Sequence, residues 1–293
     1  MDRARRNANL LLLLAAAIWG FAFVAQRVGM RHVGPLTFNG VRFLLGAAAL
    51  APLAWRGPLA APRDPRRSLR RTLRYGLPLG LILTGGATLQ QIGVLYTTAG
   101  KAGFITGLYV VFTPLLGLLI GQRTGRLTWL GAILAAGGLY LLSARGPLSI
   151  APGDGLVLLG AVFWAAHVLA VSRFVHRVAP LRLAVTQFTV CGVLSLLGAF
   201  VWETPRLAGL LAAAVPILYA GLMSVAVAYT LQVLAQRRAH PADAAIILSF
   251  ESVFAALGGG LLLGEVLSPR DLSGCALMLC GVLLAQVRRP VSE

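Results

Sequence analysis

The two halves of this chain repeat the same landmarks in the same order. Trp19 and Pro35 in the first half are matched by Trp164 and Pro180 in the second, and the members of each match lie 145 positions apart. Each half contains five apolar stretches. An odd number of spans per repeat would invert the second copy in the membrane, an architecture typical of secondary transporters.

The composition indicates that lipid is the solvent of this chain. Hydrophobic residues make up 58% of the 293 residues and charged residues only 12%. A globule with this composition could not present a water-compatible surface, so we expect an integral membrane protein embedded in the lipid bilayer. The net charge of +17 would suggest nucleic acid in a soluble domain, but the arginines lie between or at the ends of apolar stretches. Nucleic acid is therefore not an expected partner.

Ten apolar stretches are candidates for crossing a hydrocarbon layer of roughly 30 Å. They are 9–28, 36–55, 75–97, 102–120, 128–143, 154–175, 182–202, 209–234, 242–263 and 270–287. The predicted fold class is an all-α integral membrane protein with ten transmembrane helices, arranged as two inverted five-helix repeats. The predicted repeats are residues 1–147 and 148–293.

The distribution of arginines predicts the orientation in the membrane. The longest connection, residues 56–74, holds Arg56, Arg63, Arg66, Arg67, Arg70, Arg71 and Arg74. By the positive-inside rule this loop is cytoplasmic, and counting spans from it places both termini on the cytoplasmic side. We expect a multi-pass protein of the cell membrane, with the bacterial inner membrane as the favoured location.

Four groups of residues resemble the drug/metabolite transporter superfamily, and specifically its ten-span EamA-type branch. They are Trp19-Gly20, Arg42-Phe43, Glu251 before Val253-Phe254-Ala255-Ala256, and Leu263-Gly264-Glu265. The resemblance covers nearly the whole chain and implies export of metabolites such as amino acids. Ser252 stands where the family usually has a proline. The ninth span therefore lacks the residue that usually breaks its helix. Gly121-Gln122-Arg123 replaces the usual Gly-Glu pair after the fourth span.

Trp19 and Trp164 each lie about ten residues into a predicted span, roughly 15 Å deep at 1.5 Å per residue. Tryptophan normally prefers the membrane interface. Two symmetry-related aromatic side chains near the bilayer midplane can form the floor of a substrate cavity. The alternative is plain helix packing beside Gly20 and Ala165.

Two charged residues lie inside predicted spans. Arg42 can bind a substrate carboxylate through its guanidinium fork, or it can be a structural arginine satisfied by helix-end carbonyls. Glu251 lies ten residues beyond Pro241 and can exchange a proton or pair with a substrate amine. The alternative for Glu251 is a carboxyl group that bridges helices, whereas Asp243 is expected only as the charged first turn of the ninth span.

Uncharged polar residues supply further candidates for a binding site. His167 follows Trp164 by three residues and therefore lies on nearly the same helix face. Gln90, Tyr109 and Tyr229 also lie within predicted spans. These side chains can line an aqueous route, but polar side chains also commonly join membrane helices by hydrogen bonds.

The favoured function is a secondary transporter that exports small metabolites by alternating access, with amino acids as the leading substrate class and aromatic ones among them. The chain has no glycine-rich phosphate loop, so a gradient would supply the energy, with proton coupling as one option. Its three cysteines lack metal-ligand spacing, and no cofactor or metal is expected. The alternatives are a passive channel or facilitator and, less favoured, a membrane enzyme acting on lipid-linked substrates. The expected assembly is a monomer or a homodimer.

Overall fold

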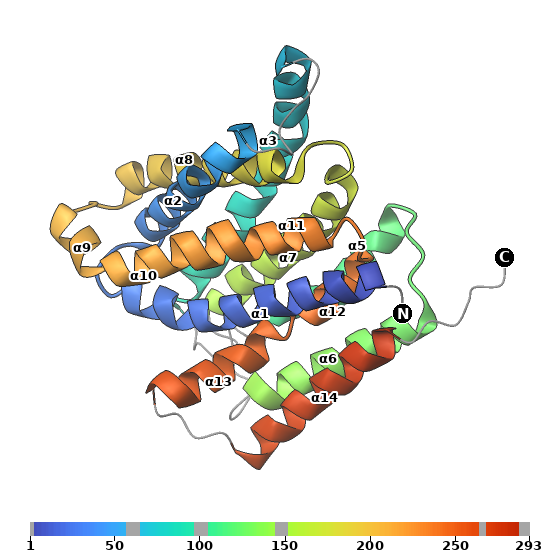
Figure 1. The fold of residues 1–293 in the computed structure, drawn as a ribbon. Helices are drawn as coiled ribbons and strands as arrows, with labels where there is room; N and C mark the ends of the chain where they lie inside the picture. Colours follow the sequence, from blue (N-terminus) through green and yellow to red (C-terminus); the bar gives the residue numbers. More distant parts are fainter. Residues whose placement is uncertain (1–2, 57–64, 97–104, 144–151, 264–267, 287–293) are drawn as a thin grey trace.

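The structure is a computed structural model that describes residues 3–56, 65–96, 105–143, 152–263 and 268–286. These residues form an all-helical bundle without a β-strand (Figure 1). The first half contains α1 (Arg3–Gly29), α2 (Pro35–Arg56), α3 (Pro65–Gly93), α5 (Tyr109–Leu119) and α6 (Arg126–Ser143). The second half contains α7 (Pro152–Phe174), α8 (Pro180–Trp202), α9 (Leu207–Ala212), α10 (Ala214–Leu218), the π-helix η1 (Tyr219–Tyr229), α11 (Thr230–Ala235), α12 (Pro241–Leu248), α13 (Glu251–Leu263) and α14 (Pro269–Gln286).

Proline marks the start of many of these helices. The helices α2, α3, α7, α8, α12 and α14 all begin at a proline. Proline suits the first helical position because its φ is fixed near the helical value and its missing N–H would have no intrahelical partner there. The matched landmarks Pro35 and Pro180 are therefore equivalent helix starts.

Six helical segments of the described chain are long and apolar enough to cross a membrane. They are Ala4–Gly29, Pro35–Trp55, Pro152–Phe174, Pro180–Trp202, Ala214–Ala235 and Pro241–Gly258, and Ile105–Leu119 and Arg126–Leu141 are shorter apolar helices. The predicted third span is not among the six, because α3 begins in an arginine-rich stretch and carries the polar residues Gln90 and Gln91 in its last turn. The total of ten spans stays a prediction.

The predicted ninth span is broken in its middle. Helix α12 ends at Leu248 and α13 starts at Glu251. The Ser249 hydroxyl donates a 2.8 Å hydrogen bond to the Ile246 carbonyl, a local side-chain bond that competes with a regular helix. The break thus forms although Ser252 replaces the proline that usually accompanies it. The predicted fourth span is interrupted in a similar way at Leu108, just before α5.

The packing pattern is preserved when the two halves are exchanged. The first-half helix α1 packs against η1 and α13, and its counterpart α7 packs against α3 and α5. Helices α2 and α8 pack against each other, as do α6 and α14. This pattern fits an architecture built from two repeats.

Glycines allow α6 and α14 to approach closely, and the two helices lie side by side in Figure 1. A Cβ atom added to Gly131 would come within 2.6 Å of the Gly281 carbonyl oxygen. A Cβ atom added to Gly138 would come equally close, at 2.6 Å, to the carbonyl oxygen of Gly274. Backbone contacts of this kind are typical of small residues at membrane helix interfaces.

Charged side chains from α8 and its C-cap hold both ends of α2. The Glu203 carboxylate accepts hydrogen bonds from the backbone N–H groups of Leu36 and Thr37, at 2.7 and 2.9 Å. At the other end of α2, Arg182 Nε donates to the Ala54 carbonyl at 3.1 Å. A carboxylate at a helix N-terminus and a cation at its C-terminus both complement the helix dipole. The two contacts fix α2 along α8.

Candidate functional site

A central cavity is lined by residues from both halves of the chain. Its empty space amounts to about 560 Å³, counting the part that is open to solvent. The lining residues are Trp19, Phe23, Gln26, Arg42, Gln90, Thr106, Tyr109, Trp164, His167, Val168, Ser224, Tyr229, Gln232, Leu248 and Glu251.

All eight residues that the sequence analysis proposed for a binding site line this cavity. They are Trp19, Arg42, Gln90, Tyr109, Trp164, His167, Tyr229 and Glu251. The structure therefore brings together side chains that are up to 232 positions apart in the sequence. That these side chains bind a substrate stays a prediction.

The two tryptophans flank Tyr229 and are anchored by different groups. The Trp19 indole N–H donates a 3.1 Å hydrogen bond to the backbone carbonyl of Ser224, in the π-helix η1. The Trp164 indole N–H donates a 3.0 Å bond to the side-chain oxygen of Gln90. The ring centroid of Tyr229 lies 4.6 Å from that of Trp19 and 6.3 Å from that of Trp164. The rings form one continuous aromatic wall.

Arg42 lines the cavity with much of its hydrogen-bonding capacity unused. Its Nε donates a 3.0 Å bond to Asn39 Oδ1, and the Asn39 amide donates in turn to the Ala87 carbonyl at 3.1 Å. The guanidinium lies 4.8 Å from the ring centroid of Phe43. Within the described ranges no carboxylate lies within 4.0 Å of the guanidinium. Such a group fits an arginine that recognises an anion, because its fork is oriented but not neutralised.

Glu251 occupies the first position of α13, immediately after the helix break. It is the one acidic residue among those that line the cavity, and the hydroxyl of Tyr109 interacts with its carboxyl group. Gly20 in α1 packs against this turn, because a Cβ atom there would lie 2.7 Å from the Glu251 carbonyl oxygen. Trp19 thus lines the cavity, while its neighbour Gly20 permits α1 to pack closely on α13.

His167 lies on the cavity wall nearest to α8. One of its ring nitrogens, Nε2, is 2.7 Å from the side-chain oxygen of Gln187. In the described part of the chain, Nδ1 of His167 and the side-chain oxygen of Gln232 are buried without a hydrogen-bond partner. Both residues line the cavity, so unpaired polar atoms remain where a substrate or water can bind.

Sequence analysis did not propose several of the lining residues. Phe23 and Gln26 follow Trp19 by four and seven positions, and this helical spacing could have identified them. No sequence pattern identified Ser224, because it contributes only its backbone carbonyl, and the position of that carbonyl depends on the path of η1.

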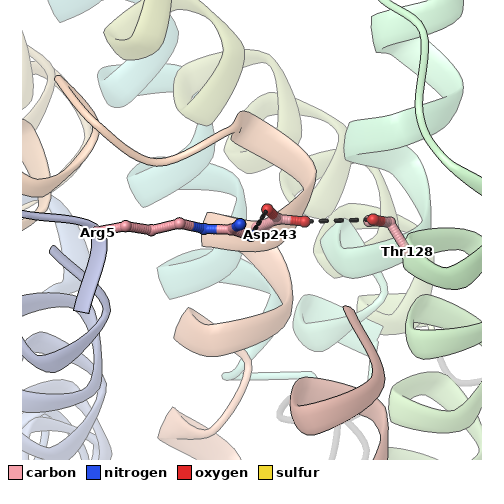
Figure 2. Close-up of polar contacts among 3 residues, drawn as sticks. All are labelled: Arg5, Thr128 and Asp243. Atoms are coloured by element: carbon pink, nitrogen blue, oxygen red, sulfur yellow. Dashed lines mark hydrogen bonds and ion pairs between the residues drawn. The ribbon is translucent and has the colours of Figure 1, made fainter. Parts of the chain in front are cut away.

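A polar cluster outside the cavity connects three helices (Figure 2). Arg5 Nη2 of α1 donates to Asp243 Oδ2 of α12 at 3.0 Å. Thr128 of α6 donates its hydroxyl proton to the other carboxylate oxygen at 3.3 Å. We call these three residues the Asp243 cluster. Asp243 does lie in the first turn of α12, as expected, but it also links α1 to α6.

Among the described residues no group of three or more His, Cys, Asp and Glu side chains could hold a metal ion. The polar groups of the cavity are therefore a mixture of one cation, one carboxyl group, amides, hydroxyls and an imidazole. This mixture suits binding and release of a polar solute.

Comparison with known proteins gives a consistent result. The model of the EamA-like transporter family matches the chain twice, at residues 6–144 and 151–286. An uncharacterized transporter of Archaeoglobus fulgidus is 31% identical over 287 residues, which cover 97% of this chain and 87% of that protein. The uncharacterized inner membrane transporter YedA of Escherichia coli K12 is 29% identical over 273 residues, covering 91% of this chain and 86% of YedA.

A solved crystal structure of another protein has the same fold. Its TM-score is 0.76 and the match covers 95% of this chain and 96% of that one, at 20% sequence identity. With helices long and apolar enough to cross a membrane and a cavity lined by both halves, the molecule is a multi-pass membrane transporter. The chain belongs to the EamA-like transporter family.

Proposed function

We propose that the chain is a secondary transporter that exports small zwitterionic metabolites from the cytoplasm, with amino acids, aromatic ones included, as the leading class. One observation carries the proposal: an arginine that forms no ion pair with any described residue, a glutamate and an aromatic wall line the same cavity. A zwitterion can present its carboxylate to Arg42 and its ammonium group to Glu251. An apolar or aromatic side chain can then pack against the rings of Trp19, Trp164 and Tyr229.

The proposed mechanism is alternating access, in which helices rock around the cavity. The helix break between Leu248 and Glu251 supports it, because discontinuous helices are common hinge positions in transporters. Tight turn bonds cross the break, from the Phe250 N–H to the Ile247 carbonyl at 3.2 Å and from the Ser252 N–H to the Ser249 carbonyl at 3.1 Å. Arg5, Asp243 and Thr128 link α1, α12 and α6 at the end of the bundle that the arginine distribution predicts to be cytoplasmic. The cavity residues Phe23 and Gln26 extend toward the other end of α1. From these two placements we infer a conformation that is closed toward the cytoplasm.

Transport by purified protein in liposomes tests the mechanism. A labelled amino acid outside the liposomes should enter faster when the same unlabelled amino acid is present inside, because an alternating site returns faster when it is loaded. Equal rates with and without internal substrate would instead indicate a passive channel or facilitator.

Competition by modified amino acids tests the roles of the two charged residues. An amino acid methyl ester, which lacks the carboxylate, should compete poorly with wild-type transport, and an N-acetyl amino acid should do the same. In Arg42→Gln the penalty for the ester should disappear while the penalty for the N-acetyl compound remains, and Glu251→Gln should show the reverse. A charged hydrogen bond is worth about 1.5–3 kcal/mol, so each penalty should be about tenfold or more. Equal penalties in wild type and variants would show that neither residue binds a charged group of the substrate.

A further inference from the structure

The start of α3 carries a row of arginines on its outward side, which we call the arginine stripe and define as Arg70, Arg71 and Arg74. All three side chains are exposed, whereas Thr72 and Gly76 on the opposite side of the helix are buried. The stripe therefore faces away from the bundle.

Contacts with α8 show where the stripe lies along the bundle. Gly76 packs against Thr186 and Gly80 packs against Val190, so α3 and α8 run parallel at this point. Since α8 begins at Pro180, six residues before Thr186, the stripe is next to the first turn of α8. Figure 1 shows that the start of α3 projects beyond the neighbouring helices.

The outward face of α3 changes abruptly from cationic to apolar. Residues seven positions apart lie on the same helix face, so Leu77 follows Arg70 and Leu81 follows Arg74. Leu77 is 45% and Leu81 57% exposed, as expected for side chains that contact lipid tails. The change from arginine to leucine within two turns marks the depth at which hydrocarbon gives way to headgroups.

Within the described part of the chain, the arginine stripe has no acidic partner. In residues 3–56, 65–96, 105–143, 152–263 and 268–286, none of its three guanidinium groups lies within 4.0 Å of a carboxylate. Arg74 lies 5.9 Å from the ring centroid of Tyr75, which leaves its donors available. Uncompensated guanidinium groups at headgroup depth are suited to bidentate hydrogen bonds with phosphodiester oxygens.

We propose that the arginine stripe is a binding surface for anionic phospholipid headgroups. The outward orientation, the adjoining leucines and the lack of a carboxylate within 4.0 Å among the described residues all fit a lipid, whose phosphate binds the arginines while its tails pack on Leu77 and Leu81. The surface is separate from the central cavity, so its test does not depend on the identity of the transported solute.

The test compares lipid retention by the full-length protein and two variants of equal charge. Each is reconstituted with phosphatidylglycerol and phosphatidylcholine, extracted with its annular lipid, and analysed by mass spectrometry. The first variant is Arg70→Gln/Arg74→Gln. The control is Arg237→Gln/Arg238→Gln, which removes two exposed arginines from the segment between α11 and α12, at the same end of the bundle.

Wild type and control should be enriched in phosphatidylglycerol. The stripe variant should lose about 25-fold of this preference, since it lacks two arginines and each arginine near an anionic surface contributes about fivefold. Equal loss in both variants would overturn the proposal, because net charge alone would then explain it. Full retention by the stripe variant would overturn it as well. So would competition by millimolar inorganic phosphate, which would make the surface a site for the free anion.

Discussion

At the scale of single residues, the contacts that orient the two charged side chains of the cavity leave their charges available to a solute. Arg42 is oriented by a neutral amide, and only 4% of its surface is exposed. Burying a cation without a counterion costs free energy in a membrane. Water or a substrate anion in the cavity lowers that cost. Glu251 is placed at the first turn of α13 by backbone packing against Gly20. Its protonation can therefore change without disturbing a salt bridge in the described chain.

Glu251→Gln should remove the pH dependence of net transport if Glu251 couples transport to protons, because glutamine cannot exchange a proton. Exchange of substrate for substrate should continue, since this mode requires no net proton movement. Both rates are measured in liposomes across a series of external pH values. Asp154→Asn is the matched control, because it removes an acidic group outside the cavity and should keep the wild-type profile. A wild-type profile in Glu251→Gln would leave the residue structural.

At the scale of helices, backbone proximity determines which positions tolerate a side chain. Gly137 and Gly138 are neighbours in α6 but meet different surroundings. A Cβ atom at Gly137 would meet only Leu277, at an ordinary contact distance of 3.4 Å, while one at Gly138 would lie 2.6 Å from the Gly274 carbonyl oxygen. The α6–α14 pair therefore depends on one glycine of the two.

Gly138→Ala should lower the melting temperature of the purified protein, whereas Gly137→Ala should leave it nearly unchanged. Overpacking of a close helix contact costs typically 1–3 kcal/mol, because the helices must move apart. Melting in detergent, followed by circular dichroism, compares the two variants directly. Similar melting temperatures would mean that α6 and α14 are less closely packed than described.

Sequence reasoning predicted the helix starts and the cavity residues better than the helix interruptions. Arg42 and Glu251 could be identified because ionisable residues inside apolar spans are rare and usually functional. The break after Leu248 lacked its usual proline and depends on the local bond of the Ser249 hydroxyl. The π-helix η1 has a sequence as apolar as that of an ordinary span, so its geometry follows from packing against α1 and α2.

At the scale of the whole molecule, the Asp243 cluster joins elements from both halves at one end of the bundle. Arg5 belongs to the first helix and Thr128 to α6, while Asp243 begins the interrupted helix that leads to Glu251. If helices rock around the cavity, the contacts of this cluster must break when the cytoplasmic end opens. Its strength would then set the balance between the two states.

Asp243→Asn should shift the population toward the inward-facing state, by roughly tenfold if one charged hydrogen bond is lost. A cysteine introduced at Gln236, in a background without the native cysteines, should react faster with a cytoplasmic thiol reagent in this variant. Thr128→Val should have a smaller effect because its 3.3 Å hydrogen bond is longer and involves a neutral donor. The exchanged pair Arg5→Asp/Asp243→Arg should restore slow labelling. Unchanged reactivity in Asp243→Asn would exclude the cluster as a closing contact.

The two tryptophan anchors differ in a way that bears on how this transporter can evolve. Trp19 is bonded to a main-chain carbonyl, which no single substitution at Ser224 can remove. Trp164 is bonded to the side chain of Gln90, which one codon change replaces. Mutation can therefore readily reorient the second-half ring, while the first-half ring retains its partner. Related proteins with different solutes should then diverge first around Trp164, and directed evolution of new selectivity would begin most productively at position 90.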